Sequence, residues 1–272
     1  MPKTLNNSLF ENDVPAFQKL KYDAAQFNFT YNGNNIIQDD IFHVIENYTR
    51  KQDTPFELLR YPIQDSELCA CTFLRGDRIF VLINASLPLS KQIFAAAHEL
   101  YHILRYFEGS NYELVSKGSI LTSNIIDDVA VEREDKEANA FAGLLLASPN
   151  ALHEQIGIYS IEVSKISISN ILTLMDIFAI PYKAMVLRLY EEGYIIKEIA
   201  CNLLEVAAEE ISAEIEITSK SKRWQNIPAN CNHYGSLWEN MSINIRNESL
   251  TPSRLYSDQH RFDEIKAIYG QE

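Results

Sequence analysis

The sequence predicts an α+β protein, in which a small antiparallel or mixed sheet packs on helices and an all-helical region follows. Three observations predict this class: two apolar β-rich runs joined by a short turn, apolar residues at helical spacing on both sides, and almost purely helical character from Ala151 onward. The 272 residues, 46% of them hydrophobic, suffice for one sizeable core or two smaller ones. We expect a sheet-containing domain over residues 1–150, a helical region over 151–222 and a C-terminal extension over 223–272.

The N-terminal part is expected to be helical. Helix-favouring sequence runs from about Asn12 to Arg50, and an Asn/Gly-rich turn at Tyr31–Asn35 divides it into two helices. A short helix is then expected around Phe56–Leu59, ending before Pro62.

The middle of the domain is expected to be a hairpin followed by two helices. The runs Leu68–Leu74 and Ile79–Ser86 predict a β-hairpin, because only four residues containing Gly-Asp separate them. A helix should begin near Ser90, since apolar residues recur at helical spacing from Ile93 to Leu104. A second strong helix is expected over Val129–Ala147.

The C-terminal half is expected to contain further helices. Ile168–Ile195 predicts a helix-turn-helix-like segment with a break at Pro181, and Tyr194 to about Ile217 predicts one more amphipathic helix. The stretch KAMVLRLYEEGYI carries one Lys and one Arg against two Glu, which is a poor surface for phosphates. We therefore expect a structural helix pair here and no direct DNA binding.

The overall composition excludes several classes of protein. A net charge of −13 argues against a general polyanion binder, because phosphate contacts need an excess of Lys and Arg. The N-terminal segment lacks the apolar core of a signal peptide, and no run approaches the roughly 18 apolar residues of a membrane span. Four cysteines in this length do not make a disulfide framework. We expect a cytoplasmic protein with no membrane contact.

The stretch FAAAHELYHIL contains the pattern of a metal site. His98 and His102 lie four residues apart on a predicted helix, so both imidazoles can reach one ion. Glu99 would lie beside that ion, where it can act as a general base toward a water molecule. The alternative is a pair of ordinary buried histidines. The helix is apolar nearly all round, however, so each buried polar group needs a partner, and a metal satisfies all three.

A third ligand is expected in the following helix. On a helical wheel Glu134 and Asp135 fall close to the apolar face, whereas Glu137 lies well to one side. Asn139 stands one turn from Asp135 and could orient a ligand histidine. The alternative for these acidic residues is a solvated first turn favoured by the helix dipole, and it is weakest for Asp135.

These motifs resemble those of a known family. His98–His102, followed by the segment Asp135–Ala142 and then by Leu144–Pro149, is similar to the ImmA/IrrE family of HExxH zinc metallopeptidases. The resemblance implies zincin-type helices within residues 1–150. It also implies a Zn²⁺ ion, with Mn²⁺ possible, held by His98, His102 and Asp135. Most relatives have Glu where this sequence has Asp135, and Glu134 and Glu137 are the alternative ligands.

The resemblance also implies an activity and a partner. Members commonly cleave transcriptional repressors in mobile-element or stress-response control, so the expected partner is a protein substrate such as a helix-turn-helix repressor. Glu99 would be the general base, and the run Ile79–Asn84 would offer a strand edge to the substrate. Tyr101, Tyr106 and Tyr112 are candidates for the transition-state donor. The alternative is a non-catalytic regulatory protein with a structural metal, acting through its helical C-terminal half.

Overall fold

A computed structural model describes residues 2–65, 67–109, 119–122, 132–227 and 233–269 of the chain. At its centre lies a five-stranded mixed sheet with the order β4-β2-β3-β1-β5. This sheet and the many helices around it confirm the predicted α+β class. The strands are β1 (Phe56–Tyr61), β2 (Leu68–Arg75), β3 (Arg78–Asn84), β4 (Ser119–Thr122) and β5 (His233–Tyr234).

The predicted hairpin is confirmed as β2 and β3, which pair in antiparallel fashion with Phe73 opposite Phe80. Their turn contains Gly76 at φ +68°, a conformation that glycine adopts at little cost. Residues Ile79, Val81 and Ile83 alternate along β3 and are fully buried. One face of the hairpin therefore points into the core.

The predicted short helix at Phe56–Leu59 is wrong, because these residues belong to β1. The strand pairs with β3 in parallel, which places Leu58 beside Val81. A short apolar run fits a buried strand as well as a helix, so the availability of a strand to pair with decides which of the two forms. The pairing strand β3 lies more than twenty residues away in sequence, and no local pattern indicates this pairing.

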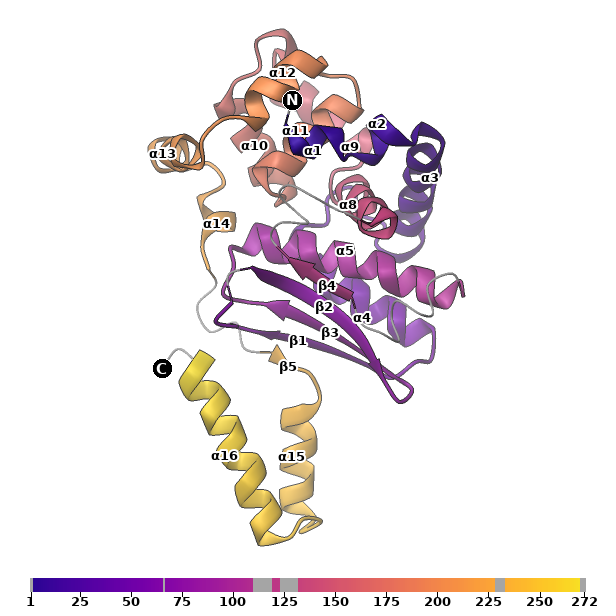
Figure 1. Cartoon of the computed structure of the whole chain (residues 1–272), viewed down its shortest axis with the longest axis vertical. Coiled ribbons are helices and arrows are strands. Elements are labelled where there is room, and N and C mark those ends of the chain that lie inside the picture. Colours follow the sequence, from indigo (N-terminus) through magenta and orange to yellow (C-terminus); the bar gives the residue numbers. More distant parts are fainter. Residues whose placement is uncertain (1, 66, 110–118, 123–131, 228–232, 270–272) are drawn as a thin grey trace.

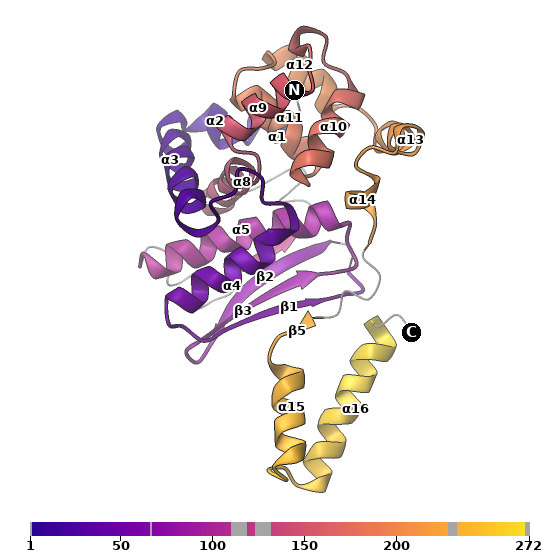
Figure 2. The ribbon, with the colours of Figure 1, turned by 180° about the vertical axis from the view of Figure 1, so that it is seen from behind.

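Two helical layers cover one face of the sheet (Figures 1 and 2). The helices α4 (Ile41–Lys51) and α5 (Leu89–Phe107) lie directly on it. Next to α5 packs α8 (Arg133–Leu146), and α3 (Val14–Tyr31) packs on α8. These four helices correspond to the helices predicted in this part of the chain, although residues 129–131 lie outside the described ranges. The N-terminal segment adds α1 (Lys3–Asn6), α2 (Leu9–Asn12) and the short 3₁₀ helix η1 (Gln38–Asp40).

The region after α8 is helical, as predicted. The break at Pro181 falls between two helices that are bent by 99° relative to each other. Among the described residues, no single helix is long and apolar enough to cross a membrane, and only this bent pair reaches the required length and composition. The helices here are α9 (Pro149–Ile158), η2 (Val163–Lys165), α10 (Ile168–Phe178), α11 (Tyr182–Glu191), α12 (Lys197–Leu204), α13 (Ala208–Thr218) and α14 (Lys222–Gln225).

The single amphipathic helix predicted from Tyr194 to Ile217 is wrong. The chain instead forms α12 and α13, and Ala207 between them has an extended backbone (φ −66°, ψ 144°). No Gly or Pro marks this break. The turn brings α13 against α10 and buries Ile215, so tertiary packing overrides the continuous helical pattern.

The extension at the C-terminus forms a helical hairpin, α15 (Leu237–Arg246) and α16 (Pro252–Tyr269), which projects from the sheet beside β5 (Figure 1). Its attachment involves Glu57 of β1, whose Oε2 accepts a 2.6 Å hydrogen bond from the backbone N–H of Ser236. Arg78 forms an ion pair with the same carboxylate. The sequence predicted no elements for this segment.

Candidate active site

Three polar residues of α5 lie in the protein interior. His98, Glu99 and His102 are each at most 1% exposed, and the helix around them is apolar, with Ala95, Ala97 and other small or aliphatic residues fully buried. The Nε2 atoms of the two histidines lie 3.1 Å apart. The four-residue spacing thus produces the convergence that helical geometry predicts.

The neighbouring helix α8 adds a carboxylate to this pair. Asp135 Oδ1 lies 3.7 Å from His98 Nε2 and 3.8 Å from His102 Nε2. A point equidistant from these three atoms lies about 2.1 Å from each, which matches zinc–nitrogen and zinc–oxygen distances of about 2.0–2.2 Å. Among the described residues these three form a group that could hold one metal ion.

Asn139, one turn after Asp135, sets the tautomer of His98. Its Oδ1 lies 2.9 Å from His98 Nδ1. Because an amide oxygen only accepts hydrogen bonds, Nδ1 carries the proton and the lone pair is on Nε2, which faces the other two side chains. Burial lowers the pKa of His98 to about 4 and the pKa of His102 well below its ordinary value. Both imidazoles are therefore neutral at pH 7, which is the form that binds metals.

Asp135 lies in an environment that disfavours its charge. Burial raises its pKa to about 6, and the nearby carboxylates of Glu132 and Glu134 act in the same direction. A bound cation would offset this cost. Together with neutral histidines that point at one place, a half-buried carboxylate with a raised pKa fits a site for a divalent metal.

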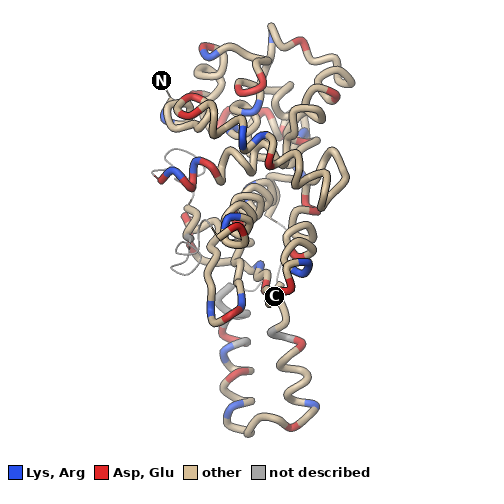
Figure 3. Tube along the Cα trace, turned by 90° about the vertical axis from the view of Figure 1, so that its right-hand side faces the viewer, with Lys and Arg blue, Asp and Glu red and all other residues tan. Residues whose placement is uncertain are grey.

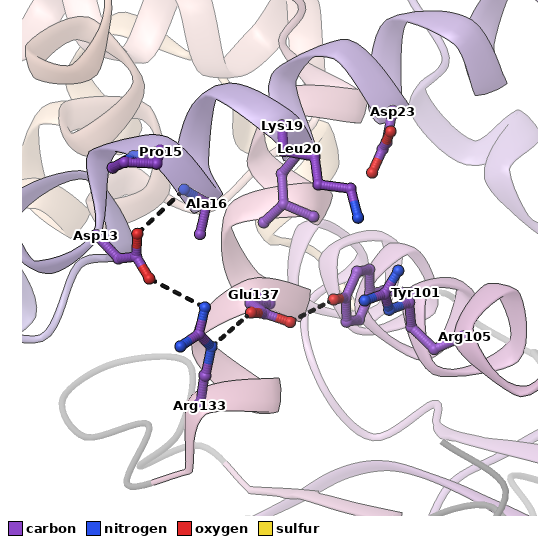
Figure 4. Close-up of a pocket in the computed structure, with 10 residues that line it drawn as sticks. All are labelled: Asp13, Pro15, Ala16, Lys19, Leu20, Asp23, Tyr101, Arg105, Arg133 and Glu137. Carbon is purple, nitrogen blue, oxygen red and sulfur yellow. Dashed lines mark hydrogen bonds and ion pairs between the residues drawn. The ribbon is translucent and has the colours of Figure 1, made fainter. Parts of the chain in front are cut away.

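The other two acidic candidates take different places. Glu137 does not belong to the group of possible ligands, and its carboxylate accepts hydrogen bonds from Tyr101 Oη at 2.6 Å and from Arg133 Nε at 2.9 Å. Arg133 also reaches Asp13 at the start of α3 (Figure 4). These residues line a pocket of about 370 Å³ between α3, α5 and α8. Glu134 is part of the same helical turn as Asp135, but it does not belong to the group of possible ligands.

Glu99 faces the sheet, where sequence reasoning had missed its neighbour. Thr72 of β2 donates a hydrogen bond from Oγ1 to Glu99 Oε2 at 2.5 Å, and both residues are fully buried. The strand's alternation could have indicated Thr72, because it is a polar residue on the side of LCACTFL that also carries Ala70 and Leu74.

The prediction that Ile79–Asn84 offers an edge to a substrate is wrong. These residues form most of β3, which lies between β2 and β1, so both of its sides are already paired. In the described part of the sheet, the edge next to β2 belongs to β4. A hairpin seen in sequence shows which strands are neighbours but not which further strands will flank them.

The structure describes the surroundings of two of the three tyrosines considered as transition-state donors. Tyr101 is buried and its hydroxyl is engaged by Glu137, and both effects raise its pKa. Tyr106 packs against Phe107 at the end of α5. Tyr112 lies outside the described residues.

The helix-turn-helix-like pair contributes little positive charge to its surface. Arg188 of α11 is 1% exposed and forms ion pairs with Glu191 and Glu192 at 2.5 and 2.7 Å. In Figure 3, Lys and Arg positions are scattered among Asp and Glu positions along the trace. A cation neutralised in the interior is not available to a phosphate group.

A mixed sheet covered by a helix with the sequence His-Glu-Leu-Tyr-His, and a carboxylate presented by the next helix, define the architecture of the HExxH metallopeptidases. Comparison with protein families gives the same class: residues 57–190 match the peptidase M78 model, described as the IrrE N-terminal-like domain. This part of the chain belongs to the ImmA/IrrE metallopeptidase family. A comparison with curated proteins gave no match.

Proposed function

We propose that this protein is a zinc-dependent endopeptidase in which His98, His102 and Asp135 hold the metal and Glu99 is the general base. The observation that carries the proposal is the convergence of three ligand atoms, about 2.1 Å from a common point, in a domain of a metallopeptidase family. Two nitrogens and one oxygen are a donor set typical of catalytic zinc, and Mn²⁺ would also accept it.

Each residue has a separate task in this proposal. A divalent metal, when bound, acts as a Lewis acid and lowers the pKa of water at its open position. Glu99 accepts the proton of the attacking water and passes it to the leaving amine. Asn139 holds His98 in the tautomer that leaves Nε2 free to bind. Asp135 supplies the negative charge that the two neutral histidines lack.

The substrate in this proposal is a protein, and we favour a helix-turn-helix repressor or a similar regulatory protein. The family resemblance supports this class of partner. An extended segment of the substrate would add as a strand beside β4, the edge strand that pairs with β2 next to Thr72. A repressor substrate would place the reaction in the cytoplasm.

The first test separates metal binding from catalysis. Glu99→Gln should retain about one zinc ion per chain and lose cleavage of a fluorescent casein and of candidate repressors, because the amide cannot accept the proton. His98→Ala should lose both zinc and cleavage. Metal content is measured by mass spectrometry after zinc loading and dialysis, and cleavage by gel electrophoresis.

Two results would count against the proposal. Cleavage by Glu99→Gln at the wild-type rate would contradict the general-base role. Stoichiometric zinc in a wild-type protein that cleaves neither casein nor a repressor would favour the alternative of a structural metal.

A further inference from the structure

The buried hydrogen bond between Thr72 and Glu99 joins the sheet to the HELYH helix. Thr72 lies on the side of β2 that faces α5, where its neighbours Ala70, Leu74 and Val81 are apolar. Valine has nearly the same shape as threonine and would suit such an environment better, because a buried hydroxyl needs a hydrogen-bond partner. The hydroxyl at this position therefore requires an explanation.

We infer that Thr72 is a positioning residue, whose hydroxyl holds the carboxylate of Glu99 in the orientation needed for proton transfer. The inference rests on the proposed function, in which Glu99 is the general base. The carboxylate oxygen Oε2 accepts the bond at 2.5 Å, a length typical of a hydroxyl donating to an ionised carboxylate. With Oε2 held by the strand, rotation of the carboxylate is restricted.

The restraint is stiff because both partners are fixed by their surroundings. Thr72 belongs to an interior strand that pairs with β3 and β4, opposite Val81 and Ser119. Its β-branched side chain has few rotamers. Glu99 is 0% exposed on a helix whose neighbouring positions are buried. A general base must lie within hydrogen-bond reach of the proton it accepts, and a misplacement of about 1 Å can cost about 100-fold in rate.

The chain provides a matched control for the removal of this hydroxyl. Thr49 of α4 is also 0% exposed, and its hydroxyl donates to the backbone carbonyl of Ile45 at 3.0 Å, within its own helix. Thr49→Val and Thr72→Val remove the same group from buried sites, but only the second removes a partner of Glu99. Thr72→Ser keeps the donor and removes only a methyl group.

The test compares these three variants by crystal structure, by thermal unfolding and by zinc-loaded cleavage of fluorescent casein. In Thr72→Val, we expect the Glu99 carboxylate to rotate away from its position while His98 and His102 stay in place. We also expect kcat to fall about 10- to 100-fold with KM unchanged. In Thr72→Ser, the position of the Glu99 carboxylate and kcat should both be those of the wild type. In Thr49→Val, the carboxylate position and kcat should also be unchanged, at a melting temperature similar to that of Thr72→Val.

The inference is overturned if Thr72→Val leaves the Glu99 carboxylate where it is, or if Thr49→Val lowers kcat as much as Thr72→Val. The proposed function fails differently, namely if wild type and Glu99→Gln are equally inactive on every substrate. In that case the crystal structures still decide whether Thr72 holds Glu99.

Discussion

At the residue scale, single hydrogen bonds decide which atoms of the candidate site face one another. Asn139 Oδ1 accepts from His98 Nδ1–H, and Thr72 Oγ1 donates to Glu99 Oε2. Asn139 lies in α8 and Thr72 in β2, so neither belongs to α5, the helix whose side chains they orient. The motif in α5 supplies the chemical groups, and side chains from α8 and β2 supply their orientation.

The role of Asn139 can be tested by zinc affinity. Asn139→Leu should weaken zinc binding by about 10- to 100-fold, because the Nδ1–H of His98 loses its acceptor and the ring is no longer held. Asn139→Asp keeps an oxygen at the same place, so this variant should bind zinc at least as tightly as the wild type. Competition with a chromophoric chelator measures both constants. Equal affinities for Asn139→Leu and the wild type would show that the contact does not orient the ligand.

At the scale of helices and strands, periodicity was a reliable guide where the element buries one clear face. The helices α5 and α8 and the β2–β3 hairpin follow their predicted patterns. Prediction failed at β1 and at the break between α12 and α13, since in both places contacts with distant residues determine the conformation. The C-terminal hairpin had no pattern strong enough to be assigned.

One contact between elements joins the helical region to the helix that carries Asp135. Arg188 of α11 donates from Nε to the carbonyl of Ala147 at the end of α8, and forms ion pairs with Glu191 and Glu192. Its aliphatic part crosses α8 at Gly143, where a Cβ atom would lie 3.0 Å from Arg188 Cδ. A glycine at this position allows the close approach of the two helices.

We expect this buried arginine to contribute strongly to stability. Arg188→Met should lower the free energy of unfolding by about 3–5 kcal/mol, because it leaves the carboxylate of Glu191 in the interior without its cation, whereas Glu192 keeps its ion pair with Lys21. The matched control is Arg254→Met, which removes an exposed pair with Asp258 on α16 and should cost about 0–1 kcal/mol. Urea unfolding measures both values. Equal losses of unfolding free energy in the two variants would mean that burial does not determine how strongly these ion pairs stabilise the fold.

At the scale of the whole molecule, the candidate site couples folding to pH. The folded-state pKa values of His98 and His102 lie below their ordinary value of 6.5, whereas that of Asp135 is raised from 3.8 to about 6. Between about pH 4 and 6 the unfolded chain binds a proton on each histidine, and the folded chain binds one on Asp135. The unfolded state thus carries one more proton in this window.

The metal-free protein should therefore lose stability as the pH falls from about 6 to 4, by about 1.4 kcal/mol per pH unit from these three groups. Urea unfolding in the presence of a chelator at several pH values measures the slope. In a variant with His98→Asn and His102→Asn the slope should be lower, because only the opposing effect of Asp135 is left. If the unfolding free energy of that variant depended on pH as steeply as that of the wild type, the pH dependence could not be assigned to His98 and His102.

The sequence by itself determined the chemical groups of the candidate site and the helices that carry them. Spacing within one helix fixes the relative direction of His98 and His102, since the helix is a rigid local structure. Only the tertiary structure decided that Asp135, and neither Glu134 nor Glu137, lies beside the histidines. It also decided that Thr72 meets Glu99 and that β4, in place of β3, forms the sheet edge next to β2. These relations depend on how separate elements cross and pair, and local sequence does not specify such distances.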